Sequence, residues 1–244
     1  MNTPPAVVEK LAGNLGSLGW VTDLLVGGSA ATGDYRTGVS DLDLVALTDG
    51  PIDAERRAVI AAIHRHLDAT ATAGTNLGCA YVAISALSDP AARHPIWTHG
   101  ELVERTLSGI VRAELVRSGF AVFGRPPQQV LPRMSDDDVR RAAQAELTGY
   151  WATAARHPWW WLNPSIADLG LTSMARGRHA LATGSLITKT SAIDSAQAPE
   201  WLRADLHARR NGEPVRSPRL RTAWIAWRDA RRTTAAARRW RPQR

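Results

Sequence analysis

The chain has 244 residues, of which 44% are hydrophobic, so it can form one large domain or two small ones with an ordinary core. It has no apolar run of about eighteen residues, which excludes a membrane span, and its single cysteine, Cys79, excludes an intrachain disulfide and a multi-cysteine zinc site. The formal charge of +7 is uneven: residues 201–244 hold thirteen Arg and three acidic residues, a net +10, which leaves a net −3 for residues 1–200.

Patterns of apolar residues predict alternating helices and strands in the first half of the chain. The expected helices cover residues 5–17 and 53–68, and the expected strands cover residues 23–27, 41–47 and 77–84. Asp53 can cap the second helix, because its carboxylate can accept from backbone N–H groups of the first turn. Prolines at positions 126, 127 and 132 then end the pattern, so we predict an α/β (α+β) domain with a mixed sheet over residues 1–128.

The remaining residues, 129–244, have a helical pattern. Ser135, followed by three aspartates, is a strong helix start, and this helix is expected to run to about residue 155. A second helix is expected over residues 164–183, ended by Gly184, and a long arginine-rich helix over residues 218–240. We therefore predict an all-α C-terminal domain.

The most informative motif joins a glycine–serine turn to a pair of aspartates. Gly28 and Ser29 follow the first expected strand, and Asp41 and Asp43 begin the second. Such a turn offers backbone N–H groups to a phosphate, and carboxylates at i and i+2 of a strand point to one face. Two hard oxygen ligands on one face suit Mg²⁺ shared with a nucleotide. The alternative, two solvated aspartates at a strand edge, is weakened by the preceding strand and turn, since same-face carboxylates repel without a cation.

This motif resembles the signature of the polymerase-beta-like nucleotidyltransferase superfamily, and within it the aminoglycoside (streptomycin/spectinomycin) adenylyltransferases. Later segments are similar, in order, to landmarks of that family, namely a helix-like stretch from His99-Gly100-Glu101 to Ala121–Gly124, then Val130–Pro132, Ala175-Arg176, Leu181–Gly184 and Leu186–Lys189. The resemblance implies Mg²⁺-dependent transfer of a nucleoside monophosphate, with ATP as the expected donor, to a hydroxyl of a small molecule such as an aminoglycoside-like antibiotic.

The resemblance also implies a role for each candidate residue. Gly28 and Ser29 would bind phosphate, while Asp41 and Asp43 would hold the metal as the catalytic pair. Arg176 and Lys189 would bind the triphosphate from the helical domain, and the acceptor would lie in the cleft between the domains. From the residues alone, Arg176 is equally a surface cation on a helix, and Lys189 a cap at a helix C-terminus.

The sequence departs from the family pattern at three positions. The acidic residue expected on the strand after the second helix is absent, and Gly78 is the best match for its position. Leu102 stands where streptomycin-modifying relatives have a tryptophan. The acidic pocket residue of the helical domain has no counterpart in register, although Asp168 lies close. Glu101, Glu146 and Asp168 are candidate replacement acids, each of which is equally a solvated helix residue.

Two further features keep alternatives open. Trp159-Trp160-Trp161 is either a stacking platform for a ligand or a packed elbow between domains. The arginine-rich C-terminus is either a nucleic-acid-binding segment or a solvated helix. The chain is accordingly either an enzyme acting on a small molecule, a nucleotidyltransferase acting on RNA or protein, or a catalytically reduced regulatory module that binds nucleotide. The first residues lack the pattern of a secretion signal, so we expect a cytoplasmic protein without a membrane partner.

Overall fold

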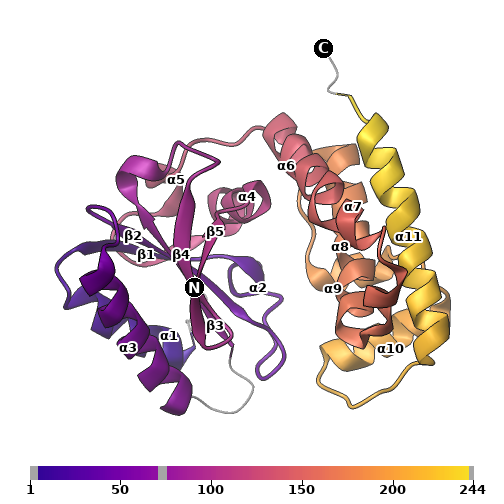
Figure 1. Cartoon of the computed structure of the whole chain (residues 1–244), viewed down its shortest axis with the longest axis horizontal. Coiled ribbons are helices and arrows are strands. Elements are labelled where there is room, and N and C mark those ends of the chain that lie inside the picture. The colour runs from indigo at the N-terminus through magenta and orange to yellow at the C-terminus, as the bar shows by residue number, and fades with distance from the viewer. Residues whose placement is uncertain (1–4, 71–75, 242–244) are drawn as a thin grey trace. The chain divides into compact units, whose positions relative to one another are not determined.

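The computed structural model of the chain describes residues 5–70 and 76–241. Its contacts form two compact units, Met1–Arg133 and Met134–Arg244 (Figure 1). The sequence predicts two domains with the boundary after residue 128, and that division stays a prediction.

The first unit is built on a six-stranded mixed sheet with the order β5-β4-β3-β2-β1-β6. Strands β2 and β3 pair in parallel, and the other neighbouring strands pair antiparallel. The expected α/β domain with a mixed sheet is therefore confirmed. In chain order the elements are α1 (Ala6–Gly16), β1 (Val21–Val26), α2 (Gly28–Ala31), β2 (Leu42–Thr48), α3 (Ala54–Thr70), β3 (Leu77–Ala83), η1 (Ile84–Ala86), β4 (Arg93–Thr98), β5 (Glu101–Thr106), α4 (Gly109–Ser118), β6 (Phe120–Phe123) and α5 (Pro127–Val130).

The two faces of this sheet bury different residues, because side chains alternate along each strand. On one face, Leu42 and Leu44 of β2 pack with apolar residues of α1 and α3. On the other face, Val45 and Leu47 of the same strand pack with Leu115 of α4. Figure 1 shows α1 and α3 on one side of the sheet and α4 on the other. Strand β2 is thus buried on both sides, and Asp43, near its beginning, is its one exposed residue.

The expected helix-like stretch that opens at His99-Gly100-Glu101 is wrong. These residues form the tight turn of a hairpin, in which Thr98 of β4 pairs with Glu101 of β5. His99 and Gly100 both adopt left-handed backbone conformations, with φ of 51° and 81°. Two successive positive φ values fit a two-residue hairpin turn and cannot start a right-handed helix. Helix α4 begins later, capped by Ser108, and the segment 120–123 belongs to β6.

The second unit is entirely helical in its described part, as expected. Its elements are α6 (Asp136–Thr148), α7 (Tyr150–Ala154), η2 (Pro158–Leu162), α8 (Pro164–Thr183), α9 (Lys189–Asp194), α10 (Glu200–Arg210) and α11 (Arg219–Arg239). They share one core that includes Trp151, Trp161, Leu171 and Met174. Among the described residues, no helix combines the length and apolar character that a membrane span requires.

Local signals in the sequence set several ends of these helices. Ser135 and Asp138 form a reciprocal capping box at the start of α6, and Gly184, with φ 74°, ends α8. The helix expected over residues 135–155 is interrupted, because Gly149 adopts non-helical dihedrals (φ −88°, ψ −103°) and separates α6 from α7.

Candidate active site

The glycine–serine turn leads directly from β1 into the single turn of α2. The backbone N–H of Gly27 donates to the carbonyl oxygen of Asp43 at 2.8 Å, which ties the turn to β2. Antiparallel pairing of Val26 with Leu44 sets the same register. The turn and the start of β2 are therefore held together by backbone hydrogen bonds, before any side chain contributes.

Gly28 lies against the carboxylate of Asp43. Its backbone has φ +57°, and a Cβ built on it would overlap that carboxylate, 2.9 Å from the Asp43 Cγ atom. Only glycine meets both conditions, because it tolerates positive φ and has no side chain to displace the carboxylate. The structure thus brings together Gly28 and Asp43, two residues that the sequence assigned to one site.

The side chains of Asp41 and Asp43 are exposed on either side of the fully buried Leu42. This alternation is the pattern expected of two carboxylates on the face of β2 opposite to Leu42 and Leu44. The Asn76 amide nitrogen donates to Asp41 Oδ1 at 2.9 Å and orients that carboxylate. Sequence reasoning missed Asn76. The only signal for it is the parallel pairing of β2 with β3, which puts Asn76 beside Asp41.

Ser29 is 8% exposed, and its hydroxyl oxygen finds no hydrogen-bond partner within the described residues. A buried hydroxyl without a partner costs free energy unless a ligand satisfies it. Its position in the turn, next to Gly28, makes it a suitable donor to a phosphate oxygen.

The donor set fits a hard cation that is shared with a substrate. The described residues contain no group of three His, Cys, Asp or Glu side chains placed to hold a metal ion, so the protein offers the two aspartates. Mg²⁺ commonly takes one or two carboxylates and completes its octahedron with phosphate oxygens and water. Gly78 lies directly opposite Asp43 in the β2–β3 pair, so no acidic side chain flanks Asp43 from that position.

The two residues predicted to bind the triphosphate, Arg176 and Lys189, are connected through the segment between α8 and α9. Arg176 in α8 donates through Nε to the carbonyl oxygen of Ile187 at 3.1 Å. Ile187 belongs to the segment between Gly184 and α9, and Lys189 is the first residue of that helix. The alternative role of Lys189 as a cap at a helix C-terminus is therefore wrong, since it lies at an N-terminus. Arg176 is half-buried and fixes the segment that precedes Lys189.

Comparison with known proteins agrees with this geometry. Residues 8–70 match the family model described as a nucleotidyltransferase domain. The first unit contains a nucleotidyltransferase domain. The match spans α1 through α3, and so includes the glycine–serine turn and both aspartates.

A solved structure extends the likeness in fold to the whole chain. Spectinomycin adenyltransferase AAD(9) from Enterococcus faecialis, solved with ATP and spectinomycin, superposes with a TM-score of 0.70 over 96% of this chain and 99% of that one, at 14% identity. No curated protein matches by sequence. The two matches confirm the expected nucleotidyltransferase of polymerase-beta-like fold that resembles the aminoglycoside adenylyltransferases.

The three candidate replacement acids differ in their surroundings. Both oxygens of Asp168 accept from the guanidinium of Arg209, at 2.6 and 3.0 Å. Burial raises the pKa of the Asp168 carboxyl, although the pairing with Arg209 acts in the opposite direction. This ion pair links α8 to α10, so the Asp168 carboxylate already has a structural partner. Glu101 is exposed in the hairpin and Glu146 is exposed on α6.

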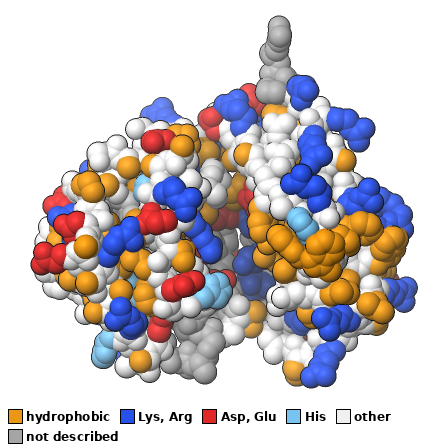
Figure 2. Space-filling view, in the orientation of Figure 1, with side chains coloured by type: hydrophobic (Ala, Val, Ile, Leu, Met, Phe, Trp, Pro, Cys, Tyr) orange, Lys and Arg blue, Asp and Glu red, His pale blue; other side chains and the backbone are white. Residues whose placement is uncertain are grey.

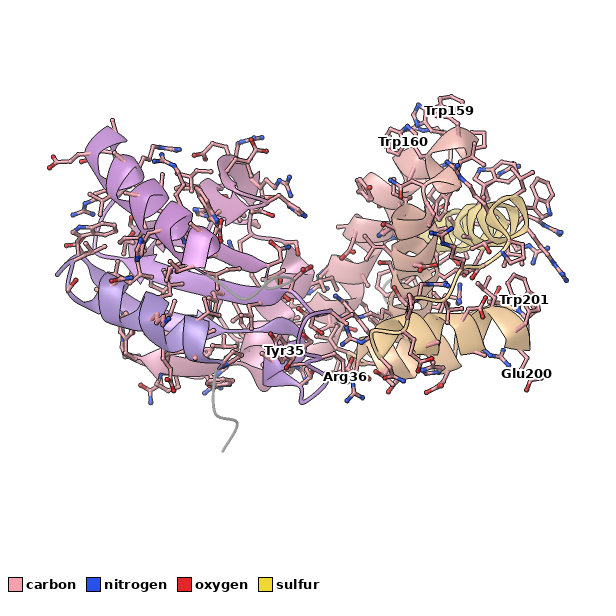
Figure 3. The ribbon with its side chains drawn as sticks, turned by 90° about the horizontal axis from the view of Figure 1, so that it is seen from below. Tyr35, Arg36, Trp159, Trp160, Glu200 and Trp201 are labelled. Carbon is pink, nitrogen blue, oxygen red and sulfur yellow. The ribbon has the colours of Figure 1, made fainter. Side chains whose placement is uncertain are left out.

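The tryptophan triplet is divided between core and surface. Trp161 is buried and donates through its ring nitrogen to the carbonyl oxygen of Ala154, which supports a packing role. Trp160 stacks on His157 with ring centroids 4.8 Å apart. Trp159 is 61% exposed, and Figure 3 shows Trp159 and Trp160 at the edge of the second unit.

Proposed function

We propose that the chain transfers a nucleoside monophosphate, with ATP as the expected donor, to a hydroxyl group of a small molecule of the aminoglycoside class. The observation that carries this proposal is the Asp43 carboxylate seated against Gly28, with Asp41 exposed on the same face. The match of residues 8–70 to the nucleotidyltransferase model supports the reaction, and the relative solved with ATP and spectinomycin supports the choice of co-substrate and acceptor.

In the proposed reaction the acceptor oxygen attacks the α-phosphorus in line, and the bond from that phosphorus to the pyrophosphate oxygen breaks. The hydroxyl proton passes to solvent water, since Gly78 stands where a carboxylate base was expected. Asp41 and Asp43 would hold Mg²⁺, which when bound would neutralise phosphate charge and polarise the reacting group. Ser29 donates its hydroxyl hydrogen to a phosphate oxygen, and the bare backbone at Gly28 allows close approach of the phosphates. Asn76 keeps the carboxylate of Asp41 in one orientation through its hydrogen bond.

Arg176 and Lys189 are proposed to bind the β- and γ-phosphates, whose charge grows as pyrophosphate departs. The hydrogen bond from Arg176 to the Ile187 carbonyl supports a joint role, because it holds the segment that leads into Lys189. Replacement of Lys189 by Ala is expected to raise the apparent KM for ATP. An effect confined to the KM of the acceptor would contradict this assignment.

The absence of a third carboxylate is expected to lower the rate of nucleotidyl transfer. A general base typically contributes a factor of about 10²–10⁴, and Gly78 cannot supply one beside Asp43. We therefore expect slow turnover. The same absence supports the alternative function, a regulatory module that binds ATP without transferring AMP.

The test is incubation of the full chain with ATP, MgCl₂ and a panel of spectinomycin, streptomycin, other aminoglycosides and tRNA, followed by mass spectrometry. A small molecule that gains the mass of one AMP supports the proposal. An adduct on tRNA alone would mean that the acceptor is RNA and not a small molecule. ATP binding without any adduct would favour the regulatory module.

Replacement of either aspartate tests the metal assignment. Asp41→Asn and Asp43→Asn are each expected to abolish Mg²⁺-dependent turnover while the circular dichroism spectrum stays unchanged, because both side chains are exposed. Asp49→Asn is the matched control, since Asp49 follows the same strand and pairs with Arg56. Full activity in both test variants would contradict the assignment.

A further inference from the structure

The C-terminal helix α11 exposes one strongly basic face. Arg228, Arg231, Arg232 and Arg239, together called the arginine stripe, line a hollow of about 360 Å³ with Ala235. At 100° per residue these positions fall within a stripe about 100° wide, and at 1.5 Å per residue the stripe is about 16 Å long. Trp224 projects from the same side of the helix, one turn before Arg228.

The charge on this face has one sign. Within the described residues, no carboxylate forms an ion pair with the arginine stripe, and the only acidic residue of α11, Asp229, lies about 60° around the helix from Arg232, toward the buried face. Asp229 is buried and accepts from Arg178 of α8 at 2.6 Å. Asp229 attracts Arg232, but its carboxylate is already paired with Arg178, so the stripe keeps an excess of positive charge that a polyanion would complement.

The stripe is not needed to hold α11 in place. The opposite face of the helix carries small residues that are almost fully buried in the core of the second unit, namely Ala223, Ala226, Ala230 and Ala237. Asp229, Arg178 and Thr233 add an internal polar contact on that side. Neutral replacements on the stripe should thus leave the fold intact, which separates a binding role from a structural one.

An aromatic surface adjoins the arginines. Trp224 is 54% exposed, and the guanidinium of Arg228 lies 5.6 Å above the centre of its ring. Trp227 packs beside it at 5.1 Å and is anchored by a hydrogen bond from its ring nitrogen to the Ala155 carbonyl. Figure 2 shows hydrophobic side chains gathered on one face of the second unit, with basic side chains along their border. An exposed indole beside a row of cations is suited to an unpaired base followed by its phosphates.

We propose that the arginine stripe and Trp224 bind a single strand of nucleic acid, with phosphates on the arginines and a base stacked on Trp224. Phosphates of one strand are about 3.4 Å apart along the axis of duplex DNA and farther apart in an extended single strand, so a stripe of about 16 Å spans more than one phosphate in either case. This is more than a single phosphate group could occupy. A membrane surface fits less well, because an interfacial helix needs its apolar face free, whereas that of α11 is buried.

The experiment measures fluorescence anisotropy of labelled 12-nucleotide single-stranded RNA and DNA with the full chain across a salt series. Replacing Arg228, Arg231 and Arg232 together by Gln should weaken binding by about 10- to 100-fold at 0.1 M salt. It should also reduce the slope of log K against log salt by about two, at about 0.7 for each phosphate contact. The matched control replaces Arg65, Arg105 and Arg133, three exposed arginines of the first unit, by Gln with the same change in net charge.

A second variant tests the aromatic contact. Trp224→Ala should weaken binding by roughly 5- to 150-fold, the equivalent of about 1–3 kcal/mol for one stacked base, and Trp224→Phe should restore most of it. Binding that is equal in the stripe variant and its control, absence of binding by the unmodified chain, or a preference for vesicles of anionic lipid over RNA and DNA would each overturn the proposal. The Asp43→Asn variant should bind the strand as the unmodified chain does, because Asp43 lies in the other unit. Strand binding can therefore be tested even if the proposed nucleotidyl transfer is wrong.

Discussion

At the level of single residues, Gly28 determines where a catalytic carboxylate can lie. Replacing it by Ala would force positive φ on a residue with a side chain and push the Cβ into the Asp43 carboxylate. We expect Gly28→Ala to lose nearly all Mg²⁺-dependent turnover, and to lower the free energy of unfolding by about 1–2 kcal/mol through backbone strain. Turnover and thermal unfolding measure the two effects separately.

Gly33 provides the control for this variant. It has a similar φ of +73°, but a Cβ built on it meets no atom within 4 Å. Gly33→Ala should therefore show the loss of stability alone. If both variants lost turnover equally, backbone strain rather than displacement of Asp43 would be the cause, and the proposed seat of the carboxylate would be wrong.

The sequence predicted the parts of this site that depend on local order along the chain. Gly28 and the two aspartates follow from a turn after a strand and from alternation along the next strand. Asn76 could not be predicted, because it contacts Asp41 only through the pairing of two strands that lie 35 residues apart. The roles of Arg176 and Lys189 remain predictions, since they depend on a bound triphosphate.

At the level of elements, expectations from the sequence are wrong where a short turn decides the structure. Helices with clear caps, such as α6 and α8, begin or end where expected, because the cap residues satisfy free backbone groups locally. The β4–β5 hairpin was mistaken for part of a helix, since His99 gives no sign that it adopts positive φ. The strands β4 and β5 gain their stability from pairing with neighbouring strands, which cannot be read from either segment alone.

The packing of α3 on the sheet contains a buried histidine whose titration affects stability. His64 of α3 is fully buried, stacks on Trp97 and shares a 2.8 Å hydrogen bond with the Tyr81 hydroxyl. Burial lowers the pKa of His64 from 6.5 to about 3. Below pH 6.5 the unfolded chain therefore binds a proton at His64, whereas the folded chain keeps His64 neutral. The contribution of His64 to the free energy of unfolding is complete above pH 6.5 and is lost as the pH falls toward 3.

Within that interval the free energy of unfolding should fall by about 1.4 kcal/mol for each pH unit. Urea unfolding at pH 7.5 and pH 5 should show a difference of about 2 kcal/mol in the unmodified chain. His64→Gln should reduce this difference, whereas His66→Gln, at an exposed position of the same helix, should leave it unchanged. An equal pH dependence in all three proteins would assign the effect to other groups.

At the level of the whole molecule, each unit has cores of its own. The sheet of the first unit separates two apolar clusters, and the second unit has a single cluster formed by its helices. The charges are also divided, because the basic excess lies in residues 201–244 while the remainder is slightly acidic. These features predict that the units are separate cooperative systems.

Two intrinsic probes can test this separation. Cys79, the single cysteine, is buried in the first unit, and burial raises the pKa of its thiol to about 12, so it should react with iodoacetamide only after that unit unfolds. Eight of the ten tryptophans lie in the second unit, so tryptophan fluorescence reports mainly on the helices. We expect urea titrations to give different midpoints for thiol labelling and fluorescence. Coincident transitions would mean that the chain unfolds as one cooperative body, because a single two-state transition makes all probes agree.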